Sequence, residues 1–100
     1  MLKPIGLEAA QRIEQLEDLM HTKWSKPVLV AFEEPGNYTS IDTTQAASWA
    51  MIEDWPVEDG DALDQALLVC AAVGSGKKKP EDARKAFVAA ALEAGLDFKA

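Results

Sequence analysis

The chain has 100 residues, of which 48% are hydrophobic and 27% are charged, and its formal net charge is −7. This composition predicts one folded domain and excludes a disordered tail, and no apolar run reaches the roughly 18 residues of a membrane-spanning helix. The single cysteine, Cys70, excludes an internal disulfide. Because the first residues lack the apolar segment of a signal peptide, we expect a cytoplasmic protein.

The first predicted element is an amphipathic helix over residues 7–20. Its apolar stripe recurs at spacings of four, three and four along one side of a helix: Ala9, Ile13, Leu16 and Met20. We therefore divide the chain into an N-terminal helical extension, residues 1–23, and a single α+β domain, residues 24–100. The stripe needs a surface to pack on, and the sequence leaves open whether its own domain or a second copy provides that surface.

A β-hairpin is predicted next. Residues 28–33 alternate between two faces, with Val28 and Val30 on the same face. Residues 34–37, EPGN, are typical of a turn, because proline presets φ and glycine adopts a positive φ. Residues 38–41 are β-branched and aromatic enough to return as the second strand.

The following helix is predicted to begin at Asp42 and to end at about residue 54, ahead of Pro56. Asp42 is followed three residues later by Gln45, which is typical of a helix-capping pair. The segment is almost wholly apolar, so we expect it to be buried on more than one side. Trp49 and Trp55 are therefore expected in the core.

Charge is distributed unevenly. Residues 41–64 carry seven acidic and no basic side chains, whereas residues 65–100 carry six basic and four acidic ones. The acidic block repels phosphate backbones, so we expect no binding to nucleic acid. Its carboxylates do not follow the spacing of a calcium-binding loop, and we interpret them as a solvated face rather than a metal site.

The central helix of the core is predicted over residues 61–73. After Gln65 this segment has no polar side chain. Cys70 lies within it, and we expect its thiol to be buried and unreactive, because an apolar environment disfavours ionisation. Gly74 then stands where the C-terminus of a helix favours a left-handed residue.

The stretch VGSGKKKP, residues 73–80, invites comparison with a phosphate-binding loop. The P-loop pattern needs a glycine where Ala71 stands and a serine or threonine where Lys78 stands, and it follows a strand rather than a helix. The stretch is therefore interpreted as a solvated linker.

The last helix is predicted over residues 80–95, with Pro80 at its first position, where the missing N–H costs nothing. One face carries small alanine side chains that allow another helix to approach closely. Phe87 anchors that face, and we expect it at the centre of the core. Val88 and Leu92 form a second apolar patch on another side of the same helix.

Four motifs are taken together: Pro27-Val28, Trp55-Pro56, Ala66 with Cys70, and the string Ala83-Arg84-x-Ala86-Phe87-x-x-Ala90-Ala91-x-Glu93-Ala94-Gly95. With these motifs the chain resembles the small bacterial proteins grouped as domain of unknown function 982, over roughly residues 24–96. The resemblance implies a small α+β domain. It implies no catalytic residue, because no activity is established for the family.

The fold expected is thus an antiparallel hairpin packed against three helices, with an N-terminal helix added. For function, the sequence shows no nucleophile–base pair, carboxylate dyad or metal cluster, and the only histidine, His21, lies far from Cys70. We expect no catalytic residue, no cofactor, no metal and no membrane. The leading interpretation is a non-catalytic homodimeric interaction module, with Val88 and Leu92 in the dimer interface.

The alternative is a small-molecule-binding regulatory domain. Trp49 and Trp55 are aromatic side chains of the kind that line ligand pockets. Arg84 lies on an alanine-rich helix, where it could pair with a carboxylate of residues 41–64 or bind an anionic ligand. A deep pocket with convergent polar groups would favour this alternative, and a flat surface with a paired edge would favour the homodimer.

Overall fold

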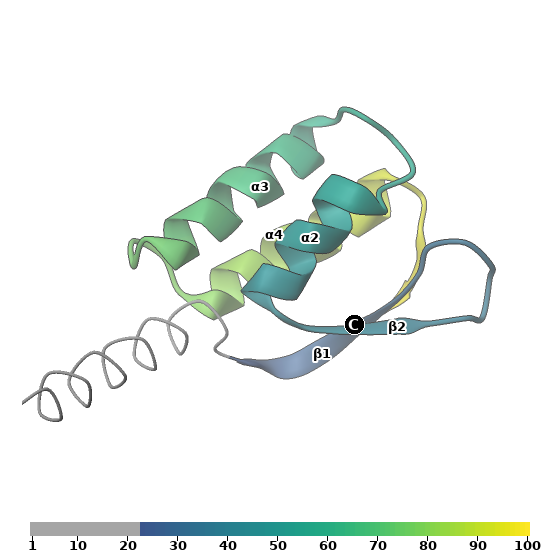
Figure 1. The fold of residues 1–100 in the computed structure, drawn as a ribbon, viewed down its shortest axis with the longest axis horizontal. Coiled ribbons are helices and arrows are strands. Elements are labelled where there is room, and N and C mark those ends of the chain that lie inside the picture. The colour runs from purple at the N-terminus through teal and green to yellow at the C-terminus, as the bar shows by residue number, and fades with distance from the viewer. Residues whose placement is uncertain (1–22) are drawn as a thin grey trace, which may run out of the picture.

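The computed structural model describes residues 23–100, so the helix predicted over residues 7–20 lies outside the described residues. A three-stranded antiparallel sheet, in the order β2-β1-β3, is covered on one face by three helices (Figure 1). This arrangement confirms the α+β class. The elements in chain order are β1 (Lys23–Ala31), β2 (Thr39–Thr43), α2 (Thr44–Glu53), α3 (Asp61–Gly74), α4 (Pro80–Glu93) and β3 (Asp97–Lys99).

The predicted hairpin is present, but the sheet has a third strand that the sequence did not predict. Val28 pairs with Ile41 of β2, and Val30 pairs with Phe98 of β3. Val28 and Val30 are fully buried beneath the helices. With three residues, β3 is too short for an alternating pattern to indicate it. Because β3 joins the sheet, β1 is the central strand, and β2 and β3 are the edge strands.

Strand β1 also begins earlier than predicted, at Lys23. The pairing with β2 changes register between Lys23 and Val28, a segment that includes Pro27, whose missing N–H suits such an irregularity. Trp24 is buried there, and its indole Nε1 donates a hydrogen bond to Thr44 Oγ1 at 3.2 Å. This bond joins the start of the sheet to the first turn of α2.

The loop between β1 and β2 is tied to the C-terminal strand. The Tyr38 hydroxyl donates to Asp97 Oδ2 at 2.9 Å, and the Gly36 N–H donates to the same oxygen at 3.3 Å. The hydrogen bond to the carboxylate raises the pKa of Tyr38. In addition, Lys99 Nζ lies 4.8 Å from the centre of the Tyr38 ring. These contacts hold the third strand in place.

Two details of α2 differ from the sequence prediction. Its cap is Thr43 rather than Asp42, because Thr43 Oγ1 accepts from the Ala46 N–H at 3.0 Å. Trp49 is 53% exposed, so its predicted place in the core is wrong. The face of α2 that meets the sheet and the other helices carries mainly small side chains, and Trp49 lies outside it: Thr44, Ala47, Ala50 and Met51 are the buried residues.

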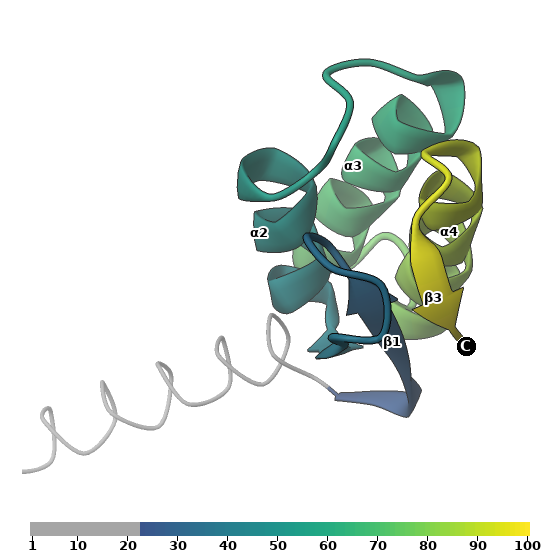
Figure 2. The same cartoon turned by 90° about the vertical axis from the view of Figure 1, so that its right-hand side faces the viewer.

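Helices α3 and α4 pack closely, and α3 lies farthest from the sheet in Figure 1. Ala66, Ala83 and Ala90 are fully buried. Such small side chains allow two helix backbones to approach. In the turned view, α4 and β3 lie on one side of the molecule and α2 on the other (Figure 2).

Phe87 stands at the centre of the core, as predicted, and is fully buried. Its ring lies 5.8 Å from that of Trp24 and 5.5 Å from that of Trp55, in tilted arrangements. Such aromatic pairs contribute beyond the area that they bury. One residue of α4 therefore contacts aromatic side chains from β1 and from the segment that follows α2.

The end of α3 also differs in detail. Gly74 is the last helical residue, and the left-handed residue is Gly76, with φ of 82°. Gly76 N–H donates to the Val73 carbonyl at 3.0 Å, and Lys77 N–H donates to the Ala72 carbonyl at 2.8 Å. This pair of bonds is the Schellman arrangement. Residues 75–79 are exposed, which fits the predicted linker.

Glu93, in the last turn of α4, caps the start of α3. Its carboxylate accepts from the Ala62 N–H at 2.9 Å and from the Leu63 N–H at 3.2 Å. Gly60 precedes α3 and is the residue that lets the carboxylate approach, because a Cβ at Gly60 would collide with the Glu93 side chain. The two helices are thus joined at this end by two charge-assisted hydrogen bonds.

Replacement of Glu93 by alanine is expected to lower the free energy of unfolding by about 1–2 kcal/mol, the effect of losing a helix cap. The measurement is a chemical denaturation curve monitored by circular dichroism. Glu81→Ala is the control, since Glu81 lies on the same helix and bonds only the exposed Ser25 hydroxyl, at 2.7 Å. Equal effects of the two substitutions would contradict a specific capping role for Glu93.

Candidate functional site

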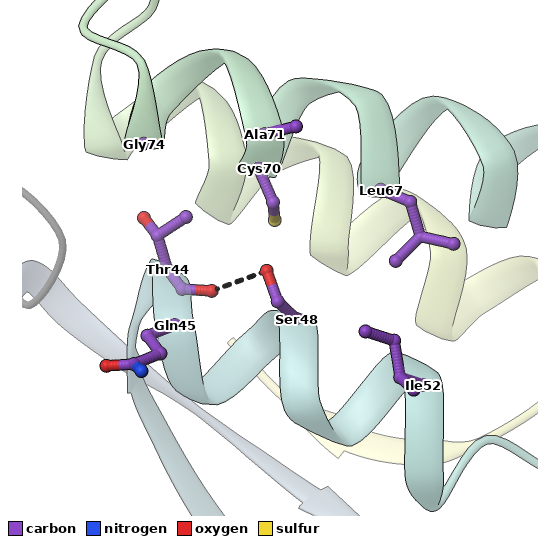
Figure 3. Close-up of a pocket in the computed structure, with 8 residues that line it drawn as sticks. All are labelled: Thr44, Gln45, Ser48, Ile52, Leu67, Cys70, Ala71 and Gly74. Atoms are coloured by element: carbon purple, nitrogen blue, oxygen red, sulfur yellow. Dashed lines mark hydrogen bonds between the residues drawn. The ribbon is translucent and has the colours of Figure 1, made fainter.

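An apolar hollow lies between α2 and α3. It has a volume of about 340 Å³. Figure 3 shows that α2 forms one wall and α3 the other. The lining residues are Thr44, Gln45, Ser48 and Ile52 from α2, and Leu67, Cys70, Ala71 and Gly74 from α3.

A second hollow, of about 440 Å³, continues toward the loop that joins the two helices. Ile52 and Leu67 line both hollows, so the two adjoin. The remaining lining residues are Met51, Trp55, Val57, Glu58, Leu63 and Asp64. The two hollows together are called the α2–α3 groove below.

Large apolar side chains are exposed at this groove. Ile52 on α2 is 65% exposed, and Leu68 on α3 is 66% exposed. Trp49 precedes Ile52 by about one turn of α2, and Leu68 precedes Ala71 by about one turn of α3, so both border the groove. Exposed apolar residues gathered in one place, rather than scattered singly, indicate an interaction surface.

The two ends of the groove differ in charge. At the loop end, the carboxylates of Glu58 and Asp64 belong to its lining. At the other end, the lining includes Gly74, and residues 77–79, three consecutive lysines, follow it closely in the chain. A ligand that lies along the groove therefore meets negative charge at one end and positive charge near the other.

Cys70 lies on the floor of the groove, with its sulfur directed toward α2 (Figure 3). The residue is 4% exposed, which confirms the predicted burial. Burial raises the pKa of the Cys70 thiol, and a hydrogen bond with Ser48 offsets this in part. The Ser48 hydroxyl itself donates to the Thr44 carbonyl at 3.1 Å. The thiol is thus held protonated, which disfavours nucleophilic chemistry.

A thiol reagent is expected to label Cys70 much more slowly in the folded protein than in denaturant at pH 8. The reason is that burial both blocks access and keeps the thiol protonated at a pH where a free cysteine begins to ionise. Stopped-flow absorbance with a chromogenic disulfide reagent measures both rates. Equal rates would show that the groove floor opens freely or that the thiolate forms readily.

The three residues proposed for ligand binding do not form one pocket. Trp55 lines the α2–α3 groove, while neither Trp49 nor Arg84 lines either of its hollows. Trp55 also packs on Phe87, and its Nε1 is buried without a hydrogen-bond partner in the described structure. Trp49 stands on the solvent side of α2.

Arg84 has a structural partner. Its Nε donates a hydrogen bond to the Lys26 carbonyl at 2.8 Å, and this bond links α4 to β1. Among residues 23–100, the one ion pair is between Lys23 and Asp42, so the predicted pairing of Arg84 with an acidic-block carboxylate is not what the fold uses. The backbone carbonyl is an uncharged acceptor that the sequence could not indicate.

The predicted dimer patch on α4 is smaller than the sequence suggested. Val88 is half-buried and packs against the core, whereas Leu92 is 70% exposed. Leu92 therefore stands nearly alone on its side of the helix. Ile52 and Leu67 line the groove and Leu68 borders it, and the sequence did not single out any of the three. The signal for them was present, since a helix that is apolar on all sides has more apolar surface than one core contact covers.

The string that carries the family resemblance, residues 83–95, has structural roles at several positions. Its buried alanines and Phe87 form the contact surface of α4. Glu93 caps α3, and Arg84 holds β1. Gly95, with φ of 72°, ends α4 by donating to the Leu92 carbonyl at 3.1 Å. These roles maintain the fold and bring no reactive group to a site.

Residues 23–100 contain no cluster of three His, Cys, Asp or Glu side chains placed to hold a metal ion. His21 lies outside the described residues. Within the same part of the chain, no helix is both long enough and apolar enough to cross a membrane.

Comparison with known proteins identifies one family. The family described as "Protein of unknown function (DUF982)" matches residues 26–98. No curated protein matches the chain, and no solved structure matches it.

Proposed function

The chain belongs to the DUF982 family of proteins of unknown function, and from that premise we propose that it is a non-catalytic interaction module that forms a homodimer. The function of the family is unknown, so the proposal depends on the surface of this chain. Two apolar faces could form the dimer interface: the α2–α3 groove and the smaller patch of Val88 and Leu92 on α4.

The observation that carries the proposal is the apolar surface at the α2–α3 groove. Ile52 and Leu68 are each about two-thirds exposed, and Trp49 is about half exposed. Burial of apolar surface is the dominant favourable contribution to most protein–protein association. Aromatic side chains such as Trp49 are also enriched at interfaces. Of the two faces, the groove has more exposed apolar surface than the α4 patch, where only Leu92 projects.

The chemistry of the groove favours binding over catalysis. Its thiol, Cys70, is buried with a raised pKa, and the Ser48 hydroxyl donates to a backbone carbonyl instead of facing a base. The remaining lining is mostly aliphatic. A protein–protein interface needs apolar area and a surface whose shape can complement a partner, and the groove is an apolar, concave surface.

Sedimentation equilibrium at micromolar concentration tests the proposal. The 100-residue chain is expected to sediment at twice the monomer mass of 10.8 kDa. Leu68→Lys is expected to give monomers, because a charged side chain would be buried unpaired in the interface. A monomer mass for the unaltered chain would refute the homodimer.

Leu92→Lys is the matched control for Leu68→Lys. The two leucines are similarly exposed, at 70% and 66%, but lie on different helices. If Leu92→Lys remains a dimer, the α4 patch is not part of the interface. If Leu92→Lys dissociates and Leu68→Lys does not, the interface is the α4 patch instead of the groove.

A second candidate function is small-molecule binding in the first hollow of the groove. Its volume of about 340 Å³ falls at the lower end of the range of ligand pockets, roughly 300–1,000 Å³. Thr44, Gln45 and Ser48 of α2 provide polar groups opposite the apolar wall that α3 forms. Native mass spectrometry of protein purified from its own host would show a bound ligand as added mass, and the same spectrum reports monomer or dimer.

A further inference from the structure

We propose that two copies pack groove against groove with their α3 helices antiparallel, so that the acidic end of each groove meets the lysine-rich end of the other. This inference rests on the proposed homodimer and specifies how the second copy is oriented on the α2–α3 groove. The orientation follows from the charges at the two ends of α3 and from the symmetry of a dimer.

The exposed apolar residues lie at the middle of the groove. Ile52 and Leu67 line both hollows, so they mark the place where the two hollows adjoin. Leu68, which is 66% exposed, follows Leu67 at the middle of α3. Trp49 precedes Ile52 by about one turn of α2. The groove thus has an apolar centre with charged residues toward its ends, which is the usual anatomy of a protein–protein interface.

Charges of opposite sign gather at the two ends of α3. Residues 53–64, which lead from the end of α2 into the first turn of α3, carry six acidic side chains and no basic one. Residues 75–85, which follow α3, carry five basic and two acidic side chains. Those two, Glu81 and Asp82, each accept a hydrogen bond within the same copy. The two charged segments lie at opposite ends of α3 (Figure 1), whose 14 residues extend about 21 Å.

The charges at these two ends are not neutralised within one copy. Among residues 23–100, the one ion pair joins Lys23 and Asp42, and neither belongs to residues 53–64 or 75–85. The side chains of residues 58, 59, 77 and 78 are all exposed. Each end of the groove can therefore meet a complementary charge on a second copy.

Two-fold symmetry allows two simple ways of placing one groove on another. If the axis runs along α3, each end meets the same end of the partner, so carboxylates face carboxylates and lysines face lysines. If the axis crosses α3, the two α3 helices run antiparallel and opposite ends meet. Like charges placed together across an interface are unfavourable, whereas opposite charges fix its orientation. The charges therefore select the axis that crosses α3.

Leu68 marks where this axis crosses the helix. Asp59 and Glu58 precede Leu68 by nine and ten residues, and Lys77 and Lys78 follow it by nine and ten. In an antiparallel pair centred on Leu68, residues equally far before and after it lie opposite each other. Leu68 of one copy then contacts Leu68 of the other, and the lysines of each copy lie beside the acidic loop of the other.

Charge reversal at these four exposed positions tests the arrangement in the 100-residue chain. Glu58→Lys with Asp59→Lys, or Lys77→Glu with Lys78→Glu, is expected to raise the dimer dissociation constant at least about tenfold at low ionic strength, because like charges then meet at both ends. The variant with all four changes, called the charge-swapped variant, is expected to recover the dimer, because opposite charges meet again. Sedimentation equilibrium measures each constant, and circular dichroism confirms that each variant is folded.

Mixing the charge-swapped variant with the unaltered chain distinguishes the two axes. One of the two proteins is labelled with ¹⁵N, and native mass spectrometry counts the mixed dimers. In the antiparallel arrangement a mixed dimer places like charges together at both ends, so its share is expected to be well below the statistical half. In the parallel arrangement a mixed dimer places opposite charges together, so a share of half or more would overturn the inference.

The outcomes for this inference and for the proposed function are separable. If Leu68→Lys is monomeric while the charge reversals leave the dissociation constant unchanged, the homodimer stands and the antiparallel arrangement fails. If Leu92→Lys dissociates and Leu68→Lys does not, the dimer uses the α4 patch and the arrangement fails with the groove. If the unaltered chain is monomeric, the proposed function itself fails.

Discussion

Replacement of Phe87 by alanine is expected to lower the free energy of unfolding by about 3–5 kcal/mol. The ring is fully buried and contacts Trp24 and Trp55, so its removal leaves a cavity between α4, β1 and the segment that follows α2. A domain has only roughly 5–15 kcal/mol of net stability. Guanidinium denaturation followed by tryptophan fluorescence measures the change.

Leu92→Ala is the matched control on the same helix. Leu92 is 70% exposed in a single copy, so its truncation is expected to change the stability of the folded chain by no more than about 0.5 kcal/mol. The comparison is made at low protein concentration, where association does not contribute. An unchanged denaturation midpoint for Phe87→Ala would show that α4 turns a different face to the core.

Replacement of Ala90 by leucine is expected to lower the free energy of unfolding by about 1–3 kcal/mol, through overpacking. Ala90 is fully buried on α4, as Ala66 is on α3, and the two helices pack closely. A leucine at position 90 has no room unless the elements packed on this face of α4 move apart. Thermal unfolding by circular dichroism and denaturant titration both measure the loss.

Ala89→Leu controls for the change in helix propensity. Ala89 is exposed, one residue before Ala90 on the same helix. The same substitution at this position is expected to alter stability by no more than about 0.5 kcal/mol, since the added side chain faces solvent. Equal losses at the two positions would contradict close packing of α3 on α4.

These expected effects explain why the family resemblance does not lead to a chemical function. The string of residues 83–95 contains the core anchor Phe87, the close-packing alanines, the cap Glu93 and the helix-ending Gly95. A match on such residues indicates the same fold. Function must then be sought on surfaces that the string does not form, such as the α2–α3 groove that we propose as an interface.

The candidate site could be predicted from the sequence only in part. Its floor was recognisable, because Cys70 lies on an all-apolar helix and was expected to be buried. Its exposed residues were not, because an apolar side chain such as Ile52 or Leu68 is assigned to a core by any rule based on hydrophobicity. Hydrophobicity identifies the apolar residues of α2 and α3, but it does not indicate which of them are exposed to solvent in a single copy.

Trp49 and Arg84 illustrate the two kinds of missing information. Trp49 lies on a helix that is apolar on every side, so periodicity could not distinguish its buried face from its open one. Arg84 donates to the backbone carbonyl of Lys26, 58 residues away along the chain. No pattern of side chains records where a distant carbonyl lies, so a carboxylate was the only partner that the sequence could suggest.

The sequence by itself determined the class of the fold, the hairpin, the three helices of the described domain and the position of Phe87 in the core. These follow from local periodicity, turn residues and helix-ending residues, which act over a few positions. Only the tertiary structure decided that β3 joins the sheet, that Thr43 caps α2, that Glu93 caps α3, and that α2 and α3 leave an apolar groove open. Each of these depends on which segments meet in space, and such meetings are set by packing over the whole chain.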